Sequence, residues 1–171
     1  RLNLDVDGSN LETDRLIHRK DVSLKGALNL QAHVGGTLDN PSVGGSVKGA
    51  SLVVNDLPLD NISGNFTYGD GILRLHRFGF TQGDGKYEAE LMHNGNNGRI
   101  IARASVDGGS LENIIRITKA PLTKITGRLD GNISVDGTTD NPNAHIQGQI
   151  TQGVMDGHDI EPSDIDVTFE A

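Results

Sequence analysis

The chain has 171 residues, of which 35% are hydrophobic and 23 are glycine. This length suits one ordinary domain, and the low apolar fraction argues against a thick, closed core. The formal net charge of −8 disfavours a nucleic-acid partner, because phosphate backbones are bound by clustered Lys and Arg side chains. Cysteine is absent, which excludes disulfides, zinc–thiolate sites and thiol catalysis.

No apolar stretch approaches the roughly 20 residues that a membrane-spanning helix needs, and no signal peptide is visible. Residues 1–5 already alternate like a strand and lack an initiator methionine, so we expect a fragment of a longer protein. The alternation fails over residues 11–20, for which a weak helix or an irregular segment is predicted.

After this segment, apolar and polar residues alternate with a period of two, which is typical of strands with one buried face. The pattern is clear in residues 26–34, 60–68, 86–91, 99–106, 127–136, 143–150 and 163–170. Roughly ten to twelve strands are expected in all. Short Asp-Gly and Asn-Gly links between them favour antiparallel hairpins. The sequence therefore predicts an all-β protein.

Residues 71–80 are the exception among the expected strands. Phe78 and Phe80 fall on the opposite face from Leu73 and Leu75 if the alternation is strict. A β-bulge inserts one extra residue and changes the phase of the side chains. We therefore expect a bulge or a bend within this segment.

One segment, residues 110–117, carries a clear helical signal. Ser110 is a good N-cap, and Leu111, Ile114 and Ile115 follow at helical spacing before Pro121 ends the pattern. At most two short helices are therefore expected, this one and the weaker segment near the N-terminus.

The apolar positions of the alternating segments define one expected inward face. It comprises Leu28, Leu30, Val34, Ile62, Phe66, Tyr68, Tyr87, Leu91, Ile100, Ala102, Ile133, Val135, Ile146, Ile150, Val167 and Phe169. Glycine and alanine residues occupy several positions between the larger side chains of this face. One interpretation is a flat sandwich or solenoid core, in which glycine permits tight packing. The other is a curved sheet with an open apolar groove, because glycine eases bending and small side chains leave room for a ligand.

The sequence offers no catalytic, metal-binding or cofactor-binding constellation. Its six histidines are scattered without ligand spacing, and His33 and His145 fall on the expected outward faces of their strands. An enzyme on a parallel β-helix, such as a polysaccharide lyase, would need charged residues clustered on one face, whereas the acids here fall mainly in turns. We therefore expect a protein that is not an enzyme and holds no metal or cofactor.

An imperfect repeat of about 100 residues is present, in which residues 26–75 resemble residues 127–171. Both copies contain the string Val-x-Gly-Thr-x-Asp-Asn-Pro, which ends at Pro41 and Pro142. With an insertion of two residues after this string, Gly45 aligns with Gly148 and Phe66 with Phe169. The repeat predicts a single elongated β domain over residues 1–171, without a separate second domain.

The sequence of residues 34–47, Val-Gly-Gly-Thr-Leu-Asp-Asn-Pro-Ser-Val-Gly-Gly-Ser-Val, resembles the repeated unit of the TamB family. These translocation and assembly module proteins belong to the AsmA-like group of bacterial envelope proteins. Residues 57–64 and 71–75 resemble the downstream strands of the same family, and residues 135–142 resemble a second unit. The resemblance extends over residues 26–171.

This resemblance implies a taco-shaped or tubular β-groove with an apolar concave face. It implies a periplasmic part of a protein that is anchored in the inner membrane and reaches the outer membrane. The expected partners are phospholipid acyl chains, the outer-membrane barrel protein TamA with its client proteins, and neighbouring repeats of the same chain. The expected function is to carry or shield acyl chains during outer-membrane biogenesis. The alternative is a chaperone-like scaffold that binds β-strands of outer-membrane proteins during assembly with TamA.

Overall fold

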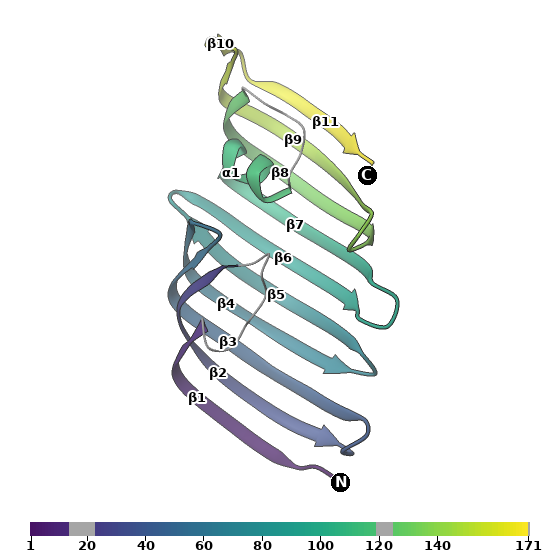
Figure 1. The fold of residues 1–171 in the computed structure, drawn as a ribbon. Coiled ribbons are helices and arrows are strands. Elements are labelled where there is room, and N and C mark those ends of the chain that lie inside the picture. The colour runs from purple at the N-terminus through teal and green to yellow at the C-terminus, as the bar shows by residue number, and fades with distance from the viewer. Residues whose placement is uncertain (14–22, 119–124, 171) are drawn as a thin grey trace.

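The fold is a single antiparallel sheet with one short helix, seen in a computed structural model that describes residues 1–13, 23–118 and 125–170 (Figure 1). The all-β expectation is confirmed, since strands make up well over half of the chain. The helix is α1 (Leu111–Thr118). The strands are β1 (Leu4–Glu12), β2 (Leu24–Gly36), β3 (Pro41–Val54), β4 (Leu57–Gly69), β5 (Ile72–Gln82), β6 (Gly85–Asn94), β7 (Arg99–Ser110), β8 (Ile125–Thr138), β9 (Pro142–Met155), β10 (His158–Ile160) and β11 (Ser163–Phe169).

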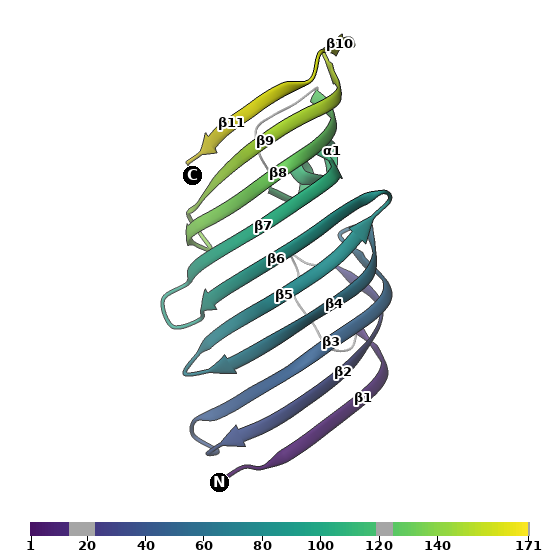
Figure 2. The same ribbon diagram turned by 180° about the vertical axis from the view of Figure 1, so that it is seen from behind.

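The strands follow one another across the sheet in chain order, from β1 to β10. Each pairs antiparallel with the next, as the short turn sequences predicted. β10 and β11 share the last place, because β10 pairs with the end of β9 and β11 pairs with its first half. Within the described residues β1 pairs only with β2, and β11 only with β9, so the sheet is open at both edges (Figure 2).

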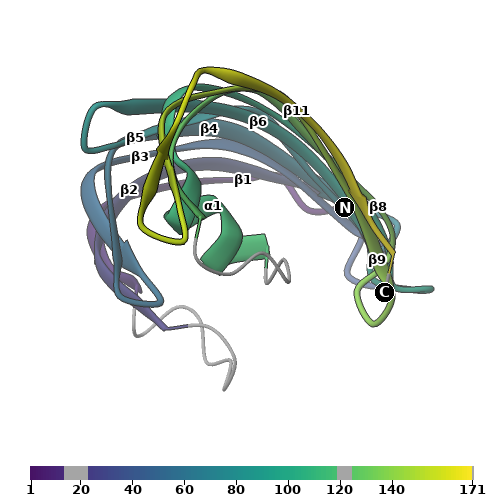
Figure 3. The ribbon, with the colours of Figure 1, turned by 90° about the horizontal axis from the view of Figure 1, so that it is seen from above.

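The sheet is strongly curved and forms an arch, and α1 lies beneath the arch, on its concave side (Figure 3). The hydrophobic core is divided into two clusters on this side. The larger one gathers Leu111 and Ile114 of α1 with Tyr87, Leu129 and Ile146 of the sheet. The smaller one consists of Leu52, Leu59 and Ile62 and involves no helix.

The bulge expected in residues 71–80 lies in the middle of β5. The pairing of β5 with β6 shifts between Leu75 and Phe78, and Arg77 adopts a positive φ of 48°. The extra residue returns Phe78 to the face that carries Leu75, since the strand alternation is broken once between them. All the large apolar side chains of β5 after Ile72 therefore share one face.

The two copies of the repeat form the same hairpin. Gly36 pairs with Pro41 in β2–β3, and Gly137 pairs with Pro142 in β8–β9. In each turn the threonine N–H donates to the asparagine carbonyl, over 3.1 Å from Thr37 and 3.2 Å from Thr138. The residue pairs match throughout at a constant offset, so the two-residue insertion assumed in the sequence alignment is wrong. The assigned faces are unchanged, because a shift of two residues preserves the alternation.

A pair of glycines allows a close approach of β8 and β9. Gly131 and Gly148 face each other directly, and a Cβ atom on Gly148 would lie 2.7 Å from the Cα of Gly131 and would also meet the Asp130 carbonyl oxygen. The glycines therefore let the two backbones come close together at this pair. At this pair glycine permits tight packing, as in the first of the two interpretations of the inward glycines.

Helix α1 begins where its N-cap predicted. The backbone N–H of Asn113 donates a hydrogen bond of 3.2 Å to the Ser110 hydroxyl oxygen, which also bonds to the Glu112 carboxylate at 2.9 Å. The other helical or irregular segment was expected over residues 11–20. Its first two residues belong to β1, and residues 14–20 lie outside the described part.

Candidate functional site: an apolar trough on the concave face

The pairing register places all sixteen predicted inward residues on one face of the sheet. Directly paired positions in adjacent strands point to the same side, so the face can be followed from strand to strand. One continuous row runs through Phe66, Leu75, Leu91, Ala102, Val135 and Ala144, from β4 to β9. A second row runs through Ala89, Ala104, Ile133, Ile146 and Val167, from β6 to β11. We call this concave apolar surface the trough.

Three aromatic rings join the two core clusters in the middle of the trough. Phe80 stacks on Tyr87 with ring centres 4.7 Å apart and an interplanar angle of 7°. Phe78 follows at 6.1 Å from Phe80, tilted by 56°. Phe80 contacts both clusters, so the apolar surface is continuous from the N-terminal strands to the C-terminal strands.

The trough has two unlike halves along the strand direction. In the helix-side half, α1 and the nearby strand ends bury their side chains, and Leu129 and Ile150 are 0% and 4% exposed. In the open half, near the turns that join β2 to β3 and β8 to β9, the apolar side chains are half-buried or exposed. Leu4 is 57% exposed and Tyr68 is 42% exposed. Among the described residues, nothing lies over this open half.

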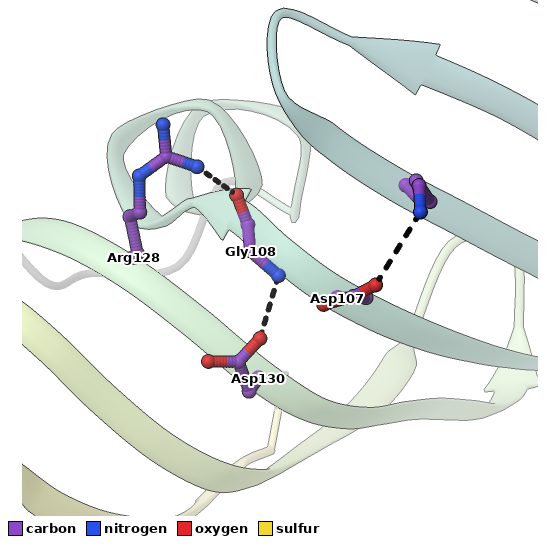
Figure 4. A network of polar contacts seen from close by, with 5 residues as sticks. Asp107, Gly108, Arg128 and Asp130 are labelled. Carbon is purple, nitrogen blue, oxygen red and sulfur yellow. Dashed lines mark hydrogen bonds and ion pairs between the residues drawn. The ribbon is translucent and has the colours of Figure 1, made fainter.

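A cluster of polar contacts holds the start of α1 in place (Figure 4). The end of β7 bulges at Gly108, whose φ of 61° favours glycine. Two side chains of β8 bind both backbone groups of this residue: Arg128 donates to the Gly108 carbonyl at 2.9 Å, and Asp130 accepts from its N–H at 2.6 Å. Arg128 also pairs with Asp84 at 2.8 Å. The bulge therefore turns the chain from the sheet into the trough.

The pKa of the Tyr87 phenol departs from its ordinary value. Burial raises the pKa of the Tyr87 phenol above 10.0, and the Ser110 backbone and Arg128 partly offset this rise. Its hydroxyl is buried and makes no well-formed hydrogen bond, and the same holds for the side-chain carbonyl oxygen of Gln82.

The convex face is polar, as expected from the alternation. It carries the two histidines that were assigned to it: His33 lies 2.7 Å from Asp5, and His145 lies 2.7 Å from Asp166. In the part of the chain that the structure describes, no group of three His, Asp or Glu side chains could hold a metal ion.

Sequence reasoning missed several residues of the trough. Phe78 and Phe80 could not be assigned, because the bulge in β5 reverses the phase partway along the strand. Leu4 and Val6 were missed because only their pairing with Val34 and Ala32 places them on this face. In the structure the positive φ of Arg77 marks the bulge. The sequence alone does not reveal this backbone conformation.

The described residues contain no helix that is long and apolar enough to cross a membrane. Comparison of the chain with protein-family models, with curated proteins and with solved structures finds no match.

Proposed function

We propose that the trough carries or shields the acyl chains of phospholipids. The observation that carries this proposal is the unbroken apolar face of an open sheet. In the open half of the trough these side chains are half-buried or exposed, and no described element covers them. Contiguous apolar surfaces of this kind are rarely left exposed without a binding role. The acidic, polar convex face would remain in water.

The expected energetics suit an acyl chain. Each methylene group that leaves water contributes about 0.8 kcal/mol, independent of its orientation. Rows of similar side chains across β4 to β9 offer many nearly equivalent positions, so a chain could shift along the trough without crossing a large barrier. Its polar head group would stay in water at the open half.

The resemblance to the TamB family supports the biological setting of this proposal. In that setting the chain is a periplasmic part of an envelope-spanning protein and serves outer-membrane biogenesis beside TamA. The second candidate function is the capture of strands from outer-membrane proteins. It would use the free edges of β1 and β11 instead of the trough.

Substitutions on the two faces of one strand test the proposal. Ala102→Arg places a charge in the open trough, whereas Ile101→Arg places the same charge on the convex face. Because an open site keeps the charge hydrated, we expect a stability loss on the order of 1 kcal/mol for either variant. Binding of a fluorescent fatty-acyl probe should be lost only in Ala102→Arg.

A second pair extends the test to β8. Ile133→Asp lies in the trough, and Ser134→Asp is its neighbour on the convex face. The proposal is refuted if the unmodified protein binds no acyl probe, or if both members of a pair weaken binding equally. Mass spectrometry of an organic extract of the purified protein should in addition detect co-purified phospholipid.

A further inference from the structure

Helix α1 covers part of the trough with the same kind of group that an acyl chain would bring there (Figure 3). Its buried side chains, Leu111 and Ile114, are aliphatic and are 0% and 3% exposed. Ile115 is half-buried and packs against the same cluster. Its outward residues, Glu112 and Arg116, are charged and exposed. The helix therefore packs on the sheet as an amphipathic ligand would, although it belongs to the same chain.

The sheet and the bulge that leads into α1 do not depend on this helix. The β2–β3 hairpin has the register of β8–β9, with no described helix above it. The bulge recurs at the end of β1, where the N–H of Asn10 donates to the Asn29 side chain at 2.9 Å. This contact matches the one from Gly108 to Asp130 at 2.6 Å. The floor beneath α1 should therefore keep its shape when the helix leaves it.

The packing beneath α1 is imperfect. A cavity of about 580 Å³ lies beside the helix and is lined by Asn113 of α1 and by Leu57 and Gln82 of the sheet. Gln82 is 8% exposed, and its buried side-chain carbonyl oxygen makes no well-formed hydrogen bond. The same holds for the Tyr87 hydroxyl, which lies beside Gly109 at the approach to the helix. Burying such atoms costs free energy, which is recovered when water reaches them. The packed position of α1 therefore carries a cost, and the cavity gives the helix room to shift.

The length of α1 determines what happens when it leaves the sheet. The helix has eight residues, and helices this short are not stable in water without tertiary packing. It follows the bulge at Gly108, whose φ of 61° favours glycine. A released α1 would therefore unwind and expose its backbone amides, while the bulge keeps it tethered to β7.

We propose that α1 occupies an acyl-binding site in the free protein and leaves this site when an acyl chain binds. Leu129, Ile146 and Ile150 form its floor, and methylene groups would replace Leu111 and Ile114 upon it. The inference rests on the proposed function and extends the acyl site from the open half of the trough into the filled half.

Hydrogen exchange of the full chain with palmitate tests the inference. A ligand that only covered the trough would slow exchange in every element that it contacts. Here the amides of α1 should exchange at least tenfold faster with palmitate bound, because the released helix unwinds, while those of β8 stay protected. Unchanged or slower exchange in α1 with palmitate bound would overturn the inference alone. Absence of palmitate binding would instead refute the proposed function, and the inference with it.

Truncation of a buried side chain provides a second test. Ile114→Ala weakens the packing of α1 but leaves the floor intact, so palmitate affinity should rise about tenfold as the open state becomes more populated. Ile114→Val should raise it by a smaller factor and serves if the alanine variant fails to fold. Leu59→Ala is the matched control, because it truncates a buried side chain of the smaller cluster, and it should not raise the affinity. An equal rise in the control, or no rise in either Ile114 variant, would overturn the inference.

Discussion

The β2–β3 and β8–β9 hairpins have the same register and the same turn, but their concave faces differ. Under α1, the second hairpin holds Leu129, Ile146 and Ile150, which are 0%, 0% and 4% exposed. The matching positions in the first hairpin are Leu28, Gly45 and Gly49, which are only half-buried. Equivalent backbones thus form a filled core in one place and a shallow, open surface in the other. Side chains and the connection between strands decide which of the two results.

The largest expected difference comes from removing side chains at equivalent positions. Leu129→Ala should lower the free energy of unfolding by about 2–5 kcal/mol, because the packed helix leaves a cavity that cannot collapse fully. Leu28→Ala should cost only about 1 kcal/mol, because the side chain is half-buried. Urea denaturation of both variants measures the difference. Equal losses would mean that the first hairpin is as well packed as the second.

The tight glycine contact provides the next comparison. Gly148→Ala should destabilise the protein by about 1–3 kcal/mol, because the new methyl group meets the backbone of β8. Val47 occupies the matching position in the first hairpin, where it pairs with Leu30, so a side chain is already accommodated there. Thermal melts should show that Val47→Ala costs less than Gly148→Ala. The reverse order would mean that the backbone of β8 leaves room for a methyl group at Gly148.

The polar contacts at Gly108 tie the helix to the second hairpin. Arg128→Ala removes a hydrogen bond to the bulge and an exposed ion pair, so we expect a loss of about 1 kcal/mol. Hydrogen exchange should accelerate in α1 more than in β2 or β3. Lys86→Ala, which removes only the 4.0 Å pair with Asp107, should leave the exchange of α1 unchanged. An equal acceleration in both variants would exclude the proposed positioning role of Arg128.

The smallest effect concerns the pH dependence of the filled region. Because the pKa of Tyr87 is raised in the folded chain, the unfolded chain loses its proton first as the pH rises. The ionisation of Tyr87 therefore leaves the free energy of unfolding unchanged below pH 10.0 and lowers it as the pH rises above this value. Tyr87→Phe should reduce this alkaline loss and cost little at neutral pH, because the buried hydroxyl makes no well-formed hydrogen bond. Melting curves of both proteins between neutral and alkaline pH provide the measurement.

The alternation of side chains predicted the strands and their faces, because a half-buried sheet imposes a period of two. The Ser110 cap predicted the start of α1 for an equally local reason. The location of α1 could not be predicted, since its place beneath the arch depends on the Gly108 bulge and on Arg128 and Asp130 of a later strand. The sequence predicted most of the residues that line the trough. Its division into a filled half and an open half depends on tertiary packing, which the period does not encode.

The order of the strands also determines how the sheet responds to force. Among the described strands, each interior strand pairs only with its neighbours in the sequence, apart from the shared place of β10 and β11. A force that separates the two edges acts perpendicular to the strands. It therefore breaks the hydrogen bonds between strands in sequence, a few at a time. The sheet should therefore lengthen by the release of one strand after another, and the strands that remain should keep their pairing. A force experiment would record this as a series of small steps and not as one large rupture.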